Sequence, residues 1–250
     1  MSDRPASATS PASPRARSWW SMSTTHARWS LRTTWRNGEQ LLLVIGIPVI
    51  AVLVLTRTDL LASDGPALAV VAALIVLGSG FTSPAITIAF ERRYGSYAFL
   101  GTTPLPRSAI IAGTLAAIAV TTLVSLGIVV GVWGLSGAGG QSAIESTSWV
   151  WLVAGAALGL CAVVPWAFVL GGTLRSEGVL AVANAIFVVA ILFGGVLIPA
   201  ADLPFGAVVQ WLPPGAVVQA ASGSGPGAAL TLLAWGVLGS VVATRTFRWR

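Results

Sequence analysis

Few side chains in this chain of 250 residues could carry out acid–base, nucleophilic or metal chemistry. There is one histidine, His26, one cysteine, Cys161, and no lysine. A single histidine that precedes the apolar segments cannot form a catalytic dyad or a metal cluster inside them. Without lysine, the chain lacks the phosphate-binding lysine of a P-loop and a Schiff-base nucleophile. We therefore predict that the protein is not an enzyme and holds no cofactor, and that any nucleotide chemistry belongs to a partner chain.

Six apolar segments determine the fold class. Hydrophobic residues make up 55% of the chain and charged residues only 9%. A helix needs roughly 20 apolar residues to cross a bilayer, and most of the segments are long enough. Apart from the two ends of the first, they contain no acidic residue, arginine or histidine. We predict an all-α, polytopic membrane protein, one domain over 18–250, with spans at about 39–58, 66–90, 108–135, 148–172, 179–200 and 227–244.

The arginines predict how these spans are oriented. Six crossings would place thirteen of the fourteen arginines on one side of the membrane and only Arg57 on the other. Because short cytoplasmic loops retain Lys and Arg, both termini are predicted to lie in the cytoplasm, with the protein in the cell membrane. The same distribution argues against nucleic-acid binding, since the arginines are spread as membrane flanks.

The segment before the first span has two parts. Residues 1–17 are rich in Ser, Pro and Ala and are expected to form a disordered tail. Residues 18–38 interleave four tryptophans with Arg28, Arg32 and Arg36, whose spacing of four places them along one side of a helix. This composition is typical of an amphipathic interfacial helix, with indoles at the headgroup level and arginines facing lipid phosphates or a partner.

The connection between the second and third spans is the most informative polar segment. If it is helical, Tyr94, Tyr97 and Ala98 share one side, and Gly101 can end the helix. The simplest interpretation is an interfacial helix with an aromatic belt and arginines retained on the cytoplasmic side.

The order of residues in this connection resembles the membrane subunits of type-2 ABC transporters. The resemblance rests on Glu91-Arg92-Arg93, Gly95-Ser96, Leu100, Thr103-Pro104, Arg107 and Ile111-Ala112-Gly113. Thr114 stands where members often have Lys, and Ser96 where Thr is commoner. Six spans with both termini inside also fit that family.

The resemblance implies a function for several segments. The residues Glu91, Arg92, Arg93, Tyr94, Gly95 and Ser96 would form a coupling helix that docks on an ABC ATPase subunit, which would hold ATP and Mg. The segment containing Arg28, Arg32 and Arg36 would be an interfacial helix that also approaches the ATPase, or a membrane anchor alone. A second copy of the chain, or a homologous permease, would complete the membrane path.

The segment between the fifth and sixth spans contains two short apolar pieces broken by prolines. Neither piece is long enough to cross a bilayer, so a re-entrant-like hairpin or an ordinary loop is expected. By resemblance, Asp202 and Trp211 in this segment would help to shape an outer gate.

The predicted function is the permease subunit of an ABC exporter. By resemblance, the second and fifth spans line the path, where Thr82, Ser83, Thr87 and Asn184 are polar. The neighbouring Gly78, Ser79 and Gly80 favour close helix packing instead. A path without fixed charge favours a hydrophobic or amphipathic substrate such as a drug or lipid. The alternatives are a stand-alone ion-coupled carrier and a membrane scaffold without transport function.

Overall fold

The structure, a computed structural model, describes residues 18–55, 67–135, 144–145, 147–198 and 200–246. These residues are almost entirely helical and contain no strand. The expected tail at 1–17 lies outside the described residues. The helices are α1 (Trp19–Arg36), α2 (Gly38–Leu41), η1 (Leu42–Gly46), α3 (Ile47–Leu55), α4 (Ala67–Leu77), η3 (Gly78–Thr82), α5 (Ser83–Arg93), α6 (Ser96–Leu100), α7 (Arg107–Gly134), α9 (Trp149–Thr173), α10 (Ser176–Phe193), η4 (Ala200–Asp202), α11 (Gly206–Val209), α12 (Pro213–Ser222) and α13 (Pro226–Thr246).

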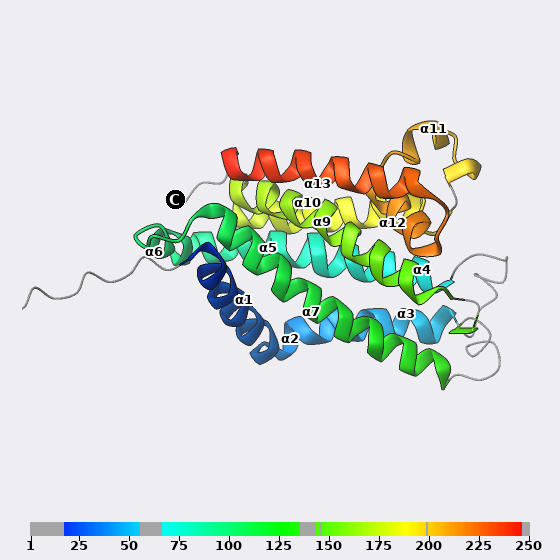
Figure 1. The fold of residues 1–250 in the computed structure, drawn as a ribbon, viewed down its shortest axis with the longest axis horizontal. Helices are drawn as coiled ribbons and strands as arrows, with labels where there is room; N and C mark the ends of the chain where they lie inside the picture. The colour runs from blue at the N-terminus through cyan, green and yellow to red at the C-terminus, as the bar shows by residue number, and fades with distance from the viewer. Residues whose placement is uncertain (1–17, 56–66, 136–143, 146, 199, 247–250) are drawn as a thin grey trace, which may run out of the picture.

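Long apolar helices run side by side along the length of the molecule (Figure 1). Five helical stretches of the described residues are long and apolar enough to cross a membrane: Ala67–Arg93, Arg107–Gly134, Trp149–Thr173, Ser176–Phe193 and Pro226–Thr246. This confirms the predicted all-α, polytopic class. The predicted first span is helical over 38–55 and packs against α7 and α4. Since 56–66 lie outside the described residues, the count of six spans stays a prediction.

Two helices end at residues that differ from the approximate ends of the predicted spans. The second span continues to Arg93 instead of ending near 90, so its last turn carries charged residues. The fifth ends at Phe193 instead of 200. Gly194 caps this helix, and Gly195 has a φ of 78° that an L side chain rarely adopts. The helix therefore stops where the glycines turn the chain.

Helix α9 is the centre of the bundle and packs against α4, α5, α12 and α13. Its side chains Leu152 and Phe168 are fully buried. Glycine permits the closest of these contacts: a Cβ added at Gly155 would lie 2.4 Å from the backbone nitrogen of Ala221 on α12. Small residues that let helix backbones approach are typical of packing inside membranes, where hydrophobicity alone does not bring helices together.

A π-helical segment, η3, interrupts the helix of the second span. Within it, Ser79 Oγ lies 2.8 Å from Thr122 Oγ1 on α7, which ties the two helices together. A Cβ at Gly80 would lie 2.8 Å from Leu160 Cδ2 on α9. The close-packing interpretation therefore holds for Gly80.

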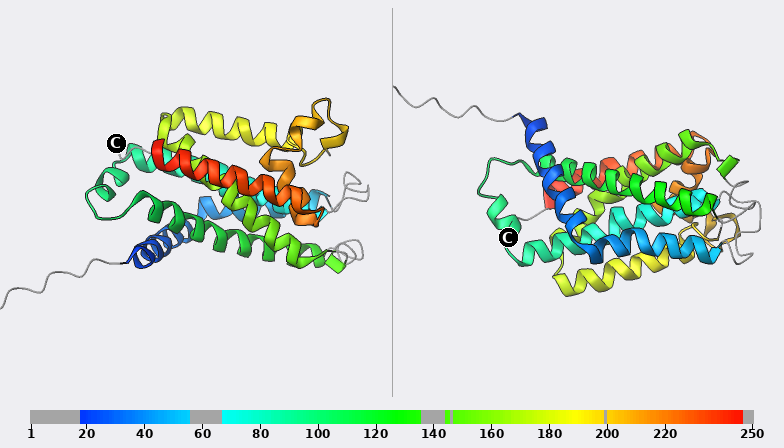
Figure 2. Two further views of the ribbon diagram at one scale, coloured as in Figure 1. Left: turned by 45° about the horizontal axis from the view of Figure 1, so that its top comes forward. Right: turned by 90° about the horizontal axis from the view of Figure 1, so that it is seen from below.

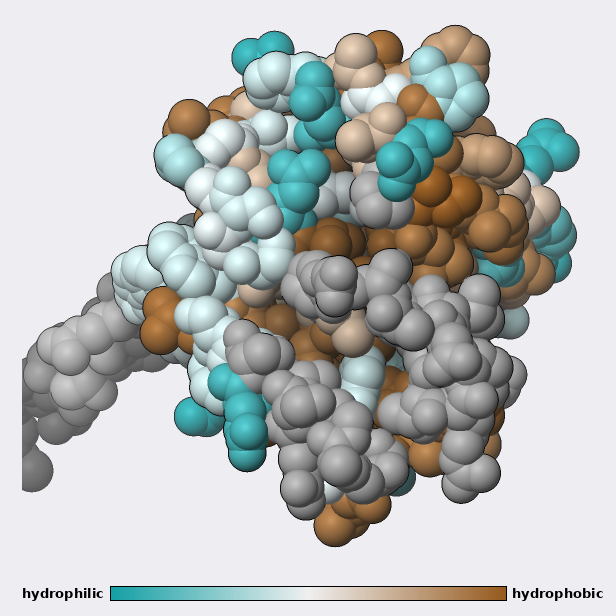
Figure 3. Space-filling view, turned by 90° about the vertical axis from the view of Figure 1, so that its right-hand side faces the viewer, coloured by the Kyte–Doolittle hydropathy of each residue, from teal (hydrophilic) through white to brown (hydrophobic). Residues whose placement is uncertain are grey.

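The two ends of the bundle differ in the elements they carry. The start of α1, the short helix α6 and the end of α13 lie together at one end, here called the inner end, and α11 and η4 lie at the opposite, outer end (Figure 2). Seen from the outer end, hydrophobic surface continues between scattered hydrophilic side chains (Figure 3). The arginine-bearing connections described by the structure thus gather at one end, as their predicted common side requires.

The segment after α10 folds back into the bundle. Pro213 and Pro214 begin α12, as suits proline in a first helical turn, and Gly223 ends it in the left-handed conformation. Ala216 and Val217 of α12 are fully buried, and the helix packs against α9 and α4. The predicted hairpin over 193–215 therefore shares only its last three residues with the buried helix α12, and in the part before α12 Val196 and Val209 are also buried.

Candidate functional site

The turn between α5 and α6 positions the residues of the predicted coupling segment. Glu91, Arg92 and Arg93 form the last turn of α5, and Tyr94 caps it. Gly95 has a φ of 80°, a left-handed conformation that glycine adopts without strain, and this reverses the chain into α6. The expected shared side of Tyr94 and Tyr97 is wrong, because Tyr94 lies outside α6 and is 76% exposed whereas Tyr97 is 3% exposed.

A buried hydrogen bond holds α6 against α5. The Tyr97 hydroxyl donates to the Glu91 carboxylate. Burial, the negative charge of Glu91 and this hydrogen bond all raise the pKa of Tyr97 well above its ordinary value. The phenol therefore stays protonated and keeps its donor, so α6 is anchored to the end of the span that precedes it.

Arg92 and Arg93 bind within the subunit. Arg92 donates to the carbonyl oxygens of Gly172 and Leu174 at the end of α9. Arginine at this position satisfies carbonyl groups left unpaired by the helix and complements the negative end of its dipole. Arg93 forms an ion pair with Glu177 of α10. Both arginines therefore brace the α9–α10 turn, and neither points freely towards a partner.

Two of the most exposed side chains of this region are aromatic. Tyr94 and Phe99, the latter 73% exposed, project at the inner end from the two sides of Gly95. Phe99 was absent from the predicted coupling residues, which ended at Ser96. Its sequence signal was weak, since Phe99 stands among other apolar residues and only the turn at Gly95 shows that it faces outwards.

Helix α1 packs on the first half of α7, and three close contacts mark this interface. Trp19 Nε1 donates to Ser108 Oγ at 3.1 Å, and His26 Nε2 lies 3.2 Å from Thr114 Oγ1. Between them, a Cβ at Gly113 would lie 2.7 Å from the Ser23 carbonyl oxygen. The contact with His26 gives a structural reason for Thr114, where the resembled family often has Lys. The remaining face of α1 carries Arg28, Arg32 and Arg36, all exposed.

A polar cavity lies between α1, α5, α6 and α7. Its volume is about 60 Å³, enough for a few water molecules. Burial lowers the pKa of His26 to about 4, so its ring is neutral at pH 7. No group of three or more metal-ligating side chains occurs among the described residues. The cavity offers hydrogen bonds to water through His26, Ser79, Thr87, Glu91, Tyr97 and Thr121.

A comparison with models of known protein families identifies a family to which this chain is similar. The model of the ABC-2 type transporter family matches residues 24–222, which extend from α1 to the end of α12. The chain belongs to the ABC-2 type transporter family. No curated protein matches it. The family makes this chain a multi-pass permease of an ABC-type transporter.

The predicted path residues of this ABC-2 permease divide between two places. Ser83 and Thr87 line the polar cavity inside the subunit. The Thr82 Oγ1 is buried and has no hydrogen-bond partner among the described atoms. Asn184 lies outside the cavity, exposed on α10, and its amide donates to the Leu180 carbonyl at 2.9 Å. The structure therefore does not bring Asn184 together with Ser83 and Thr87.

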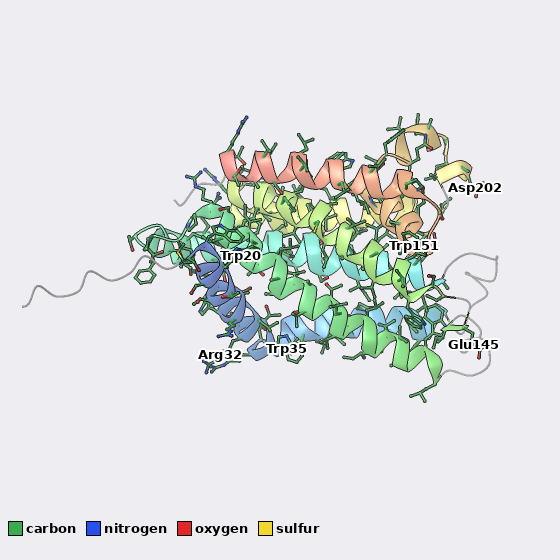
Figure 4. All side chains as sticks on the ribbon, viewed as in Figure 1. Trp20, Arg32, Trp35, Glu145, Trp151 and Asp202 are labelled. Carbon is green, nitrogen blue, oxygen red and sulfur yellow. The ribbon has the colours of Figure 1, made fainter. Side chains whose placement is uncertain are left out.

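The predicted outer-gate residues of the permease are both exposed at the outer end. Asp202 lies in η4, away from the bundle (Figure 4). Trp211 follows α11, and its backbone carbonyl accepts a hydrogen bond of 2.8 Å from Trp235 Nε1 on α13. This contact ties the chain before α12 to α13, while the Trp211 ring remains exposed.

Proposed function

We propose that this permease belongs to an ABC exporter and is driven by a separate ATPase subunit that docks on its inner end. The observation that carries the proposal is the geometry of α6. This short helix is anchored by Tyr97 to Glu91 and leaves Tyr94 and Phe99 exposed. Exposed aromatic side chains on a rigid support are typical anchors of protein interfaces.

The contacts of the inner end explain how ATPase movement would reach the membrane helices. Arg92 and Arg93 connect the end of α5 to the α9–α10 turn, and α6 is fastened to the same end of α5. A displacement of α6 would therefore move α5, α9 and α10 together as one rigid unit. ATP binding would select the arrangement in which the path faces the other side of the membrane.

The path would form between two permease copies. Helix α10 is the least buried of the five long apolar stretches, and only 17% of its 18 residues are buried inside the subunit. A second copy, or a homologous permease, packed near this surface would place Asn184 beside a passage with few other polar groups. Such a passage suits a hydrophobic or amphipathic substrate, for example a drug or a lipid.

Two exposed aromatic residues provide the test of ATPase docking. The double variant Tyr94→Ala/Phe99→Ala removes both rings from the inner end, and Phe205→Ala removes an exposed ring from the outer end as a matched control. In co-expression with an ABC ATPase subunit, we expect the double variant to lose co-purification and ATP-driven transport of a lipophilic dye in inside-out vesicles. The control variant should retain both.

The same experiment distinguishes the alternatives. Dye transport that persists without an ATPase subunit and responds to a sodium or proton gradient would indicate an ion-coupled carrier. Absence of transport with every dye, together with no ATPase binding by the wild type, would favour a scaffold. Membership of the ABC-2 family favours the ATPase-driven mechanism.

A further inference from the structure

We propose that the junction of α1 and α2 binds the headgroup of an anionic phospholipid. The structure has an open hollow of about 620 Å³ at this junction, and its lining consists of Trp29, Arg32, Thr33, Arg36, Asn37 and Gly38. The two arginines would bind the phosphate, and Trp29 would cover the glycerol region. This inference concerns the subunit in its membrane and does not depend on an ATPase.

The hollow is lined by positively charged side chains. Among the described side chains, Arg32 and Arg36 have neither an ion pair nor a hydrogen bond, whereas Arg93 is paired with Glu177. Figure 4 shows Arg32 at the edge of α1, pointing away from the helix bundle. Arg28 continues the same exposed stripe one turn earlier. Guanidinium groups bind phosphate oxygens in pairs, so this stripe is complementary to an anionic headgroup.

The orientation of α1 and its exposed tryptophans place the hollow at the headgroup level of a membrane. The opposite side of α1, containing Ser23 and His26, is buried against α7, so the orientation of the helix is determined. Trp20, Trp29 and Trp35 are exposed, and tryptophan is enriched at the headgroup level of membranes. The hollow therefore lies where phosphates are abundant.

The apolar surface beyond the hollow favours a lipid over a free phosphate compound. From Gly38 the chain continues directly into the predicted first span, on which Leu42, Ile50 and Leu53 are exposed. Ile50 and Leu53, three residues apart, share one face of α3. A phospholipid whose headgroup binds Arg32 and Arg36 can lay its acyl chains along this helix. A soluble anion would leave this surface uncovered.

Native mass spectrometry of the full chain tests the proposal. The protein is extracted in the presence of equal amounts of dioleoyl phosphatidylglycerol and dioleoyl phosphatidylcholine, and the retained lipids are counted. We expect the wild type to retain phosphatidylglycerol preferentially. Arg32→Gln/Arg36→Gln should lower this preference about thirty-fold, as expected when two arginines near a membrane surface are removed.

A matched control separates the hollow from net charge. Arg175→Gln/Arg245→Gln removes the same charge from two exposed arginines outside the hollow, and its loss of preference should be clearly smaller if the hollow, and not net charge alone, binds the lipid. An equal loss in both double variants would overturn the proposal. Arg32→Lys/Arg36→Lys keeps the charge and should recover most of the preference; a lysine pair as weak as the glutamine pair would also contradict it.

Two further measurements test whether the hollow binds a free anion or a protein instead of a lipid. Excess glycerol phosphate should fail to displace phosphatidylglycerol, and effective displacement would mean that the hollow binds a free anion instead of a lipid. An added ATPase subunit gives the second measurement. If the glutamine pair abolishes ATPase binding but leaves lipid retention unchanged, the arginine stripe is a protein-docking surface and the proposal is wrong.

Discussion

Helices α9 and α10 are joined by two residues and are similarly apolar, but they occupy opposite environments. In α9, 61% of the most apolar stretch of 18 residues is buried inside the subunit, against 17% in α10. The difference lies in the small residues. Gly155, Gly159 and Gly171 of α9 all closely approach neighbouring helices, whereas a Cβ at Gly178 of α10 would meet no atom within 4 Å.

This contrast shows what hydropathy measures in a membrane protein. Apolar composition determines that a helix lies in the bilayer, where lipid tails are as favourable a surrounding as leucine side chains. Whether protein or lipid covers the helix depends on shape, because only close contacts between backbones bring dispersion energy that lipid cannot supply. Helix α9 has small residues that allow close backbone contact on several sides. Most of the surface of α10 remains open to lipid or to a second subunit.

The largest expected loss of stability follows from truncating a buried phenylalanine, with an exposed phenylalanine as the comparison. Phe168→Ala removes a fully buried ring from α9 and should destabilise the protein by about 3 kcal/mol, since the neighbouring helices cannot fill the space. Phe193→Ala truncates an exposed ring at the end of α10 and should cost less than about 0.5 kcal/mol. Thermal unfolding of both variants in the same detergent measures the difference. Equal losses would contradict the assignment of α9 as the core helix.

A matched glycine pair tests the backbone contacts. Gly155→Ala should destabilise the subunit by about 2 kcal/mol, because its Cβ would overlap the backbone of Ala221 on α12. Gly178→Ala should be neutral or stabilising by up to about 1 kcal/mol, since alanine favours the helix. The melting temperatures should therefore move in opposite directions. A neutral Gly155→Ala would show that α12 does not pack closely on α9.

Helix α1 buries only Ser23 and His26 among its 18 residues, and its docking on α7 should weaken in acid. The pKa of His26 is about 4 when docked, against 6.5 for the free side chain. The undocked state therefore binds more protons between these values, and docking is strongest above pH 6.5 and is lost as the pH falls towards 4. Within this window, each unit by which the pH falls weakens the docking of α1 by about 1.4 kcal/mol.

Amide hydrogen exchange measures this docking. After correction for the intrinsic exchange rate at each pH, protection of α1 should fall between pH 7 and pH 5. The variant His26→Gln is the control, because it keeps a polar side chain near Thr114 but cannot be protonated. If its protection falls as steeply as that of the wild type, another group such as Glu91 in the same cavity is responsible.

The smallest effect on stability is expected for Asn184→Leu. Among the described residues, its amide bonds to the backbone carbonyl of the preceding turn, so the free energy of unfolding should change by less than about 0.5 kcal/mol. Transport of a lipophilic dye should nevertheless change if α10 borders the path. Unchanged transport would remove Asn184 from the path and leave α10 as a lipid-facing helix. Ser83→Ala in the intrasubunit cavity provides the comparison.

The sequence by itself determined the helices, the family and the end of the molecule that carries the arginines. Long apolar segments cannot fold otherwise in a bilayer, where each backbone group must be hydrogen-bonded within its own helix. The Glu-Arg-Arg turn, Gly95 and the prolines were also readable, because they act on the chain close to their own positions. The α1 helix followed in the same way from its alternation of tryptophan and arginine.

Only the tertiary structure decided which side chains remain free. Arg92 and Arg93 looked available for a partner but bind to the α9–α10 turn, and Phe99, which was not among the predicted coupling residues, is exposed. Likewise, Ser83 and Thr87 face a cavity within the subunit, away from Asn184. These assignments depend on contacts between segments about 80 residues apart, such as Arg92 with Gly172. Hydropathy and local spacing carry no information about such contacts, because each helix can turn any of its faces towards lipid until its neighbours are in place.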